Sequence, residues 1–172
     1  MNIGMVWKGS ATFKNDRNRS TDLALWKPLL DIANVTWHVL QTEATDAEIA
    51  LLAKHDTVSR RPTPVKDWAD TAAVITLLDL VITVDTGVAH LTGSLNKPVW
   101  ILLPAVPDPR WLLNRDDSVW YSSARLFRQK AAGDWQDVFA RVRDELMDMA
   151  GPQWPMQGTV TGVSRKGGSY AR

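Results

Sequence analysis

Short apolar runs alternate along this chain with segments in which apolar residues recur every three or four positions. The short runs are rich in β-branched residues and predict strands, and the periodic segments predict helices between them. Residues 80–84 and 98–103 are apolar almost throughout, which is typical of strands covered on both faces. The predicted strands are residues 3–7, 35–41, a brief one at 56–60, 80–84, 98–103 and 124–129.

Side chains that accept hydrogen bonds from free amides mark the predicted helix starts. Thr45 and Glu48 have the spacing of a capping box, in which each side chain accepts a hydrogen bond from the backbone amide of the other. The last predicted helix begins after Asp134 and runs to about residue 149. The other predicted starts are Ser20 or Thr21 before the apolar residues of 23–32, Asp67 or Asp70, and Thr86, which opens a helix over 86–95.

The alternation of strands and helices predicts an α/β domain with a parallel, doubly wound sheet, because neighbouring parallel strands need crossover connections. Ligands of such sheets bind beyond the carboxyl ends of the strands. The segments that follow Trp7, Val84 and Leu103 should therefore meet at one edge. We expect residues 1–150 to form this Rossmann-like domain. Residues 151–172, which hold five of the ten glycines, are expected to be a disordered tail.

Composition and charge change this picture little. The 172 residues include 20 basic and 19 acidic side chains, so the net charge of +1 points neither to nucleic acid nor to a membrane surface. The absence of cysteine excludes disulfides and thiolate metal sites. The sequence shows no signal peptide and no run of about 18 apolar residues. We therefore expect a cytoplasmic protein without a membrane span.

The residues Asp85-Thr86-Gly87 stand where the predicted strand 80–84 passes into a helix. The first turn of a helix has unpaired amides and a partial positive charge, which together favour phosphate. Gly87 would let a ligand oxygen approach the backbone, and the Thr86 hydroxyl could cap the helix or bind phosphate. Asp85 suits a ribose or sugar hydroxyl, and His90 could donate to a phosphate. The alternative is a capped helix with a core histidine.

The loop after the first predicted strand is basic. It carries Lys8, Lys14, Arg17 and Arg19 against one acid, Asp16. These bases could neutralise a diphosphate, arginine through forked hydrogen bonds and lysine as a point charge. A solvated surface is the alternative. The predicted position of this loop on the same edge as the strand-to-helix turn favours the binding role.

A third unusual loop covers residues 104–123, a length that is typical of functional loops. Trp111 could stack on a nucleotide base or pack the loop. Asp116 and Asp117 suggest a metal site, but no third ligand with suitable spacing accompanies them, so we predict none. The chain also lacks the GxGxxG, Walker A and GxSxG motifs, which argues against nicotinamide, P-loop and serine-hydrolase sites.

Three segments together resemble a known family: "IGMVWKGSATFKNDRNRS", "DWADTAAVITLLDLVITVDTGVAHLTGSLNKPVWILLP" and "PDPRWLLNRDDSVWYSSARLFRQ". They are similar to the C-terminal half of heptosyltransferase-like GT-B glycosyltransferases of family 9. The likeness is greatest to bacterial members fused to tetratricopeptide repeats, which are also similar to O-linked N-acetylglucosamine transferases. It spans residues 3–149. Its most specific part is the DTG-x-x-H element, followed by a strand that begins with Lys-Pro.

The resemblance implies one Rossmann-like half of a GT-B fold that binds the diphosphate of a nucleotide sugar. Thr86, Gly87 and His90 match the phosphate-binding element of the family at the helix start. Lys14 matches the lysine that neutralises the leaving diphosphate, and Arg19 stands in the same basic loop. Basic residues and the helix dipole would stabilise the departing nucleotide.

The resemblance also implies roles for two further residues. Asp85 matches the acid that opens the motif, with a role toward the ribose or the donor sugar. Trp111 would border the base. The family works without metal, so we expect no metal and no cofactor besides the nucleotide sugar, which is the donor substrate.

A GT-B enzyme has an amino-terminal domain that supplies the acceptor contacts and, in heptosyltransferases, an acidic catalytic base. No residue of this chain can be assigned as that base, so a separate acceptor domain or subunit is the expected partner. The leading hypothesis is the nucleotide-sugar-binding domain of a metal-independent glycosyltransferase. One alternative is a non-catalytic Rossmann-like interaction module, for which a homodimer through the exposed cleft face is expected. Another is a sugar-nucleotide 2-epimerase, whose acid and histidine constellation is not visible in the sequence.

Overall fold

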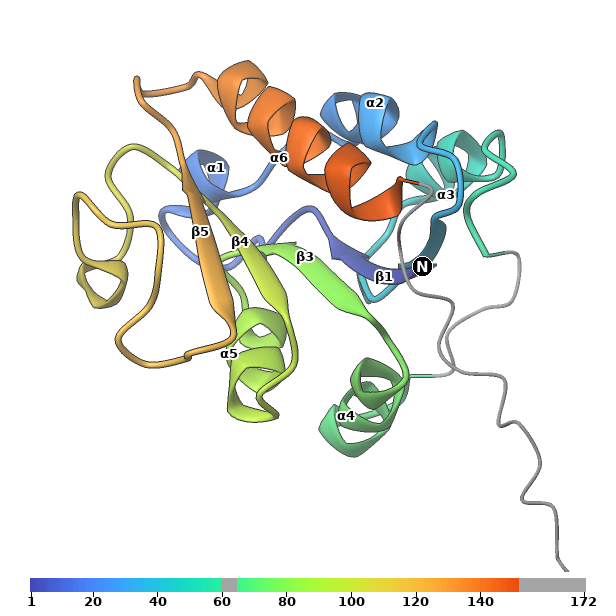
Figure 1. Ribbon diagram of the computed structural model, residues 1–172, viewed down its shortest axis with the longest axis horizontal. Helices are drawn as coiled ribbons and strands as arrows, with labels where there is room; N and C mark the ends of the chain where they lie inside the picture. The colour runs from blue at the N-terminus through green and yellow to red at the C-terminus, as the bar shows by residue number, and fades with distance from the viewer. Residues whose placement is uncertain (60–64, 152–172) are drawn as a thin grey trace, which may run out of the picture.

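The computed structural model describes residues 1–59 and 65–151. Its centre is a five-stranded sheet in which all strands are parallel and follow the order β2-β1-β3-β4-β5 (Figure 1). This arrangement confirms the predicted Rossmann-like, doubly wound α/β fold. The strands are β1 (Asn2–Val6), β2 (Thr36–Val39), β3 (Leu80–Val84), β4 (Val99–Leu103) and β5 (Ala124–Arg128).

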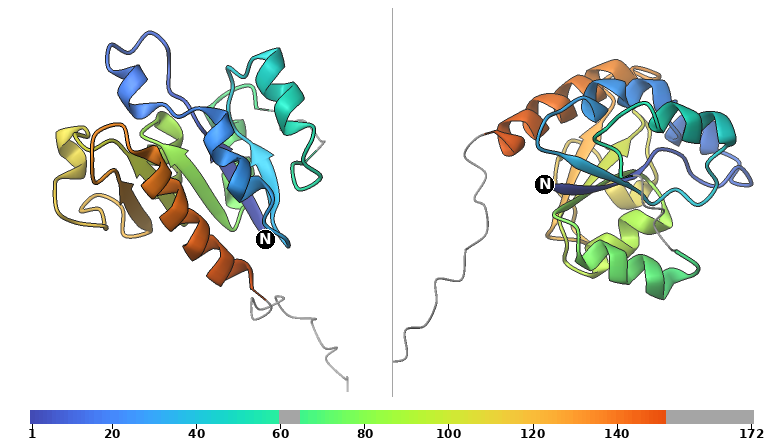
Figure 2. Two further views of the ribbon diagram at one scale, coloured as in Figure 1. Left: turned by 90° about the horizontal axis from the view of Figure 1, so that it is seen from above. Right: turned by 90° about the vertical axis from the view of Figure 1, so that its right-hand side faces the viewer.

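Helices cover both faces of the sheet, as Figure 2 shows. One face carries η1 (Leu23–Trp26), α2 (Lys27–Leu30), α3 (Asp46–Leu52) and α6 (Trp135–Ala150), and the other carries α4 (Trp68–Thr76) and α5 (Gly87–Ser94). Each face has its own apolar cluster, because successive strand residues point to opposite sides. Ile82 therefore packs in the cluster that includes Val138 of α6, and Val81 in the cluster that includes Ile75 of α4.

The strand order locates the ligand crevice of this sheet. The chain leaves β1 toward β2 on one side and then crosses to β3, β4 and β5 on the other. The direction of winding reverses between β1 and β3, and in sheets of this kind that reversal opens a crevice at the carboxyl ends of the strands. All five residues of β3 and of β4 are buried, as predicted, so these two strands form a rigid base for the loops that follow them.

The helix predicted over the apolar residues of 23–32 is broken into two short pieces, and its predicted cap is wrong. Asp22, not Ser20 or Thr21, accepts the hydrogen bond that opens η1. Pro28 explains the break, since it has no amide to donate to the carbonyl of Ala24. The amide of Lys27 donates to that carbonyl instead, which produces the tighter 3-10 turn before α2 begins.

The strand predicted at 56–60 is also wrong within the described residues. It is reduced to an isolated bridge between Val58 and Trp37 beside the edge strand β2. Two short helices were not predicted: α1 (Asp16–Arg19) in the basic loop and η2 (Pro109–Trp111) in the long loop after β4. The expected turn at 60–64 and the expected tail from 152 onward lie outside the described residues.

The predicted capping box of α3 is confirmed, and its acid joins helix α3 to the end of β1. Glu48 accepts hydrogen bonds from the backbone amide of Thr45, from Nε1 of Trp7 and from Nζ of Lys8, each at 2.7 Å. Burial alone would raise the pKa of Glu48, but the hydrogen bonds from these three donors and from the hydroxyl of Thr45 lower it from 4.5 to about 2. The ionised carboxylate is therefore part of the folded structure.

We expect the Glu48 carboxylate to make folding sensitive to acid. Its pKa is lower in the folded than in the unfolded chain, so its contribution is complete above pH 4.5 and is lost as the pH falls toward 2. The corresponding loss in the free energy of unfolding is at most about 3 kcal/mol. Urea unfolding of wild type and Glu48→Gln across this range should show a weaker pH dependence in the variant. Equal slopes for the two proteins would contradict the assignment, and Glu43→Gln, at an exposed carboxylate nearby, is the matched control.

Candidate functional site

The segments after β1, β3 and β4 meet at one edge of the sheet, as predicted. Arg19, from the segment after β1, donates from Nη1 to the backbone carbonyl of Asp85 at 2.8 Å. Arg110, from the loop after β4, donates from Nη1 to Nε2 of His90 on α5 at 3.0 Å. These contacts join the basic loop, the Asp85-Thr86-Gly87 turn and the long loop into one site.

The start of α5 leaves backbone amides available at this edge. Thr86 occupies the N-cap position with an extended backbone, φ −138° and ψ 171°, but its hydroxyl makes no capping bond. That hydroxyl lies 3.0 Å from Oγ1 of Thr83, which itself donates to the carbonyl of Val84, so Thr86 is the donor of the pair. The first amides to bond back into the helix are those of Ala89 and His90, which donate to the carbonyl of Thr86. The amides of Gly87 and Val88 precede that turn and remain the natural anion donors.

Two pockets adjoin at this helix start. The β2-side pocket, about 520 Å³, lies over the crevice between β1 and β3 and is lined by segments after β1 and β2 and by the start of α4. The β4-side pocket, about 460 Å³, is lined by the basic loop and by the loop after β4. Both are lined by Thr86 and Gly87. A ligand with two arms could therefore occupy both pockets and cross the helix start between them.

The β2-side pocket has an aromatic wall that the sequence did not reveal. Trp68, the first residue of α4, is 60% exposed and lies over Gly87. A Cβ built on Gly87 would be 2.5 Å from Cη2 of the indole ring, so the close approach requires glycine. Lys8 also lines this pocket, with its charge paired to Glu48 at 2.7 Å and its amide donating to Oε1 of Gln41.

The β4-side pocket contains a polar cluster around His90. The guanidinium of Arg110 can only donate, so Nε2 of His90 accepts its hydrogen bond and the ring proton lies on Nδ1. Nδ1 then donates to the hydroxyl of Tyr121 at 3.0 Å, while Oδ1 of Asp85 is 3.8 Å from Nε2. Burial lowers the pKa of His90 below 6.5, Asp85 raises it and Arg110 lowers it further. The imidazole is therefore held neutral, as one fixed tautomer.

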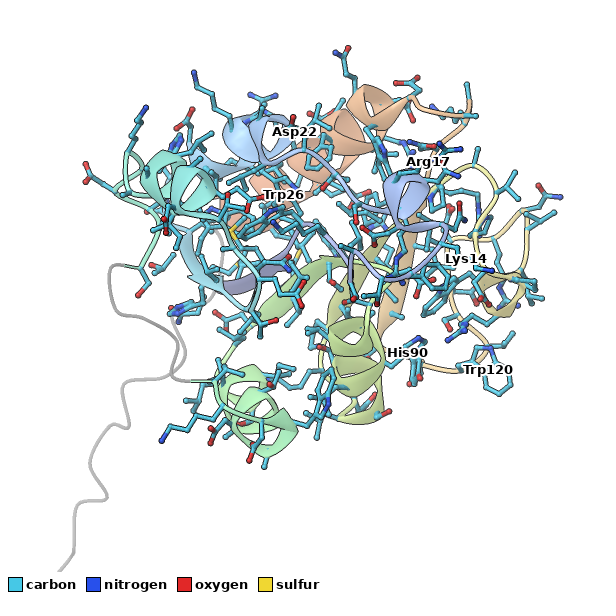
Figure 3. All side chains as sticks on the ribbon, turned by 180° about the vertical axis from the view of Figure 1, so that it is seen from behind. Lys14, Arg17, Asp22, Trp26, His90 and Trp120 are labelled. Carbon is cyan, nitrogen blue, oxygen red and sulfur yellow. The ribbon has the colours of Figure 1, made fainter. Side chains whose placement is uncertain are left out.

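The predicted basic residues have different surroundings. Arg19 is paired with Asp16 at 3.0 Å, and its guanidinium lies 4.3 Å from the centre of the Phe13 ring. It lines the β4-side pocket. Lys14 and Arg17 are exposed, and Figure 3 shows them on the side of the molecule that carries His90. The loop thus combines cations tied into the structure with cations free to meet a ligand.

Trp111 packs the loop, which is the second of the two roles considered from the sequence. Its side chain is 1% exposed, and its ring stacks on His90 with centroids 5.4 Å apart and an interplanar angle of 12°. It is out of reach of a nucleotide base in this conformation. Sequence reasoning assigned no role to Trp68, Tyr121 or Arg110, because their positions at the site come from packing between distant segments.

The Asp116–Asp117 pair shows no metal-ligand arrangement. Asp117 is bound by Arg115 in a two-point ion pair, with both distances 2.7 Å. In the described ranges, no group of three or more histidine, aspartate or glutamate side chains is arranged to hold a metal ion. Within the same ranges, no helix is long and apolar enough to cross a membrane.

The parallel sheet, its strand order and the helices on both faces define the class of this chain as a Rossmann-like domain, and its candidate ligand site lies at the carboxyl edge of the sheet. Residues 36–106 of the chain match the family model of glycosyltransferase family 9 (heptosyltransferase). The matched segment includes α4, β3 and the whole of α5, and therefore the Asp85-Thr86-Gly87 turn and His90. The match agrees with the family resemblance drawn from the sequence.

The chain is also similar to Protein FlbA of Caulobacter vibrioides, with 28% identity over 152 residues. The similar region comprises 86% of this chain and 25% of FlbA. The chain thus spans about a quarter of the length of that relative.

Proposed function

We propose that this domain binds a nucleoside-diphosphate sugar and acts as the donor-binding half of a metal-independent glycosyltransferase. The observation that carries the proposal is the meeting of two pockets at Thr86 and Gly87. A sugar nucleotide has two bulky ends joined by a diphosphate, which is the shape that this pair of pockets would accept. The match of residues 36–106, which include Thr86 and Gly87, to the glycosyltransferase family 9 model also supports the proposal.

The diphosphate is proposed to lie at the start of α5. The amides of Gly87 and Val88 point out of the first turn, and the helix dipole adds a partial positive charge there. Lys14 would approach from the exposed basic loop, and Arg19 lines the adjoining pocket. Because Thr86 donates its proton to Thr83 in this conformation, its contribution to phosphate would come after a rotation of the hydroxyl.

The nucleoside is proposed to occupy the β2-side pocket. Its aromatic wall is Trp68, which is exposed, whereas the Trp111 expected from the sequence is buried. Stacking on an exposed aromatic face stabilises a base by about 1–3 kcal/mol. The donor sugar would then lie in the β4-side pocket, where Asp85 can accept hydrogen bonds from sugar hydroxyls.

The chemistry of this half is proposed to be the stabilisation of the leaving nucleoside diphosphate. Fixed amides and cations that face the developing charge are an effective form of electrostatic catalysis. His90 is held neutral with both ring nitrogens engaged, so we assign it to binding and orientation and not to the role of catalytic base. The base and the acceptor contacts are proposed to come from an acceptor domain or subunit.

A thermal-shift screen with ADP, GDP, UDP and their sugar conjugates tests the proposal. We expect one nucleotide family to raise Tm by about 5–10 °C at 100 times its Kd, because ligand binding at that concentration adds about 2.7 kcal/mol to the free energy of unfolding. The adenosine, guanosine and uridine nucleosides are the matched controls and should shift Tm far less. A screen in which no nucleotide raises Tm would reject the proposal. Binding without sugar transfer in the presence of an acceptor domain would favour the non-catalytic module.

A further inference from the structure

Arg110 is the one guanidinium that the loop after β4 brings into the β4-side pocket. It was assigned no function from the sequence. Its Nε and Nη2 donate to the two carboxylate oxygens of Asp108 at 2.7 and 3.1 Å, and its Nη1 donates to Nε2 of His90 at 3.0 Å. The two-point contact with Asp108 fixes the plane of the guanidinium. An arginine has five N–H donors, so one on Nη1 and one on Nη2 remain for a ligand.

The backbone that carries Arg110 is clamped from several directions. Nε1 of Trp120 donates to the carbonyl of Arg110 at 3.0 Å, and Nη2 of Arg128 donates to the carbonyl of Trp111 at 3.2 Å. The indole of Trp111 is buried against His90. These contacts fix the position of the Arg110 backbone beside the pocket.

The same clamp holds a strained residue. Leu112 has φ 52° and ψ −171°, a backbone conformation that is costly for a residue with a side chain. Such strain persists only where the surrounding contacts enforce it, and it is concentrated at functional sites. The loop therefore keeps Arg110 in position at a cost to local stability.

The Arg110 guanidinium donates three hydrogen bonds, and the one to His90 is the bond that a ligand can most easily replace. Its acceptor is a neutral imidazole, whereas the two bonds to Asp108 have an ionised acceptor. A phosphate oxygen is an anionic acceptor and forms a stronger, charge-assisted bond with guanidinium than imidazole does. An anion that entered the pocket would therefore take the Nη1 donor from His90 while Asp108 kept the guanidinium oriented.

We propose that Arg110 binds the second phosphate of the donor, the one that carries the sugar, and so selects diphosphates over monophosphates. The inference rests on the proposed function: the first phosphate lies on the amides of Gly87 and Val88, and the second extends into the β4-side pocket. When the phosphate takes the Nη1 donor of Arg110, Nε2 of His90 is released while Nδ1 stays on Tyr121. That nitrogen can then accept a hydrogen bond from a sugar hydroxyl.

The test is the ratio of the affinities for the mono- and diphosphate of the nucleoside that binds best in the thermal-shift screen. Isothermal titration calorimetry should show that Arg110→Gln lowers the preference for the diphosphate at least tenfold, mainly through weaker diphosphate binding. Arg115→Gln is the matched control, because Arg115 lies in the same loop, is paired with Asp117 and does not line the pocket. It should keep the wild-type ratio.

A second measurement uses the unaltered protein. The ¹⁵N resonances of the His90 ring, identified by comparison with His90→Gln, should report Nε2 as an acceptor in the free protein. Saturation with the diphosphate should shift the Nε2 resonance, and saturation with the monophosphate should leave it in place.

The outcomes separate the two proposals. If the wild type binds diphosphate and Arg110→Gln keeps the same preference, or if the Nε2 resonance does not respond to diphosphate, the role of Arg110 is overturned and the proposed function stands. If the wild type binds none of the nucleotides, both are overturned.

Discussion

Gly87→Val is expected to abolish the rise in Tm that nucleoside diphosphates produce in the wild-type protein, while the fold is retained. A Cβ at this position would lie 2.5 Å from the ring of Trp68, so the valine must displace the indole or occupy the space above the helix start. Either result blocks the point at which the two pockets meet and screens the amides of Gly87 and Val88. The fold should survive because Gly87 has a helical backbone without positive φ and Trp68 is exposed.

The matched control for this prediction is Ser94→Val at the other end of α5. Ser94 is exposed and lies outside both pockets, so the nucleotide-induced shift should be unchanged there. Thermal unfolding without ligand and far-ultraviolet circular dichroism establish that Gly87→Val is folded. A folded Gly87→Val protein that keeps the full wild-type shift would place the diphosphate elsewhere.

Trp111→Ala is expected to lower the free energy of unfolding by about 3–5 kcal/mol, the usual cost of removing a buried tryptophan side chain. The ring of Trp111 is 1% exposed and belongs to the apolar cluster that includes Ala89 of α5. It also stacks on His90, so its loss should release the loop that carries Arg110. Urea unfolding measures the change, and a loss of less than about 1 kcal/mol would show that the loop is not anchored through this ring.

Two further variants test which property of Trp111, the volume of its buried ring or its polar N–H group, accounts for the expected loss of stability. Trp111→Phe should recover most of the stability, because the indole N–H of Trp111 has no hydrogen-bond partner among the described residues and only part of the ring volume is lost. Trp120→Ala, in the same loop, removes a ring that is 64% exposed and one hydrogen bond to Arg110. Its cost should stay below about 1.5 kcal/mol.

Most strands and most helix starts were predictable because their signals are local. The buried run of β3 and the capping box of Thr45 and Glu48 depend on residues that are neighbours in sequence. The helix after residue 22 was mispredicted because apolar periodicity continues through Pro28, although the backbone cannot continue its hydrogen bonds there. The strand prediction at 56–60 failed for a related reason: a strand needs pairing partners along its whole length, and among residues 56–59, which the structure describes, only Val58 forms a bridge.

For the candidate site, the sequence by itself determined the turn at Asp85-Thr86-Gly87 and the presence of a basic loop. A strand that ends at an acid, a hydroxyl and a glycine before a helix carries its chemistry within a few residues. The order of elements also placed the loops after β1, β3 and β4 on one edge, because parallel strands end on the same side.

Only the tertiary structure decided which side chains line the candidate site. Lys8 is paired with Glu48, and Arg19 with Asp16, so the charge of the basic loop is smaller than its composition implies. Trp111 is buried and Trp68 exposed, although both are tryptophans beside polar residues in the sequence. Such differences arise from contacts between segments far apart in the chain, and burial and pairing of that kind depend on the packed fold and not on local residue order.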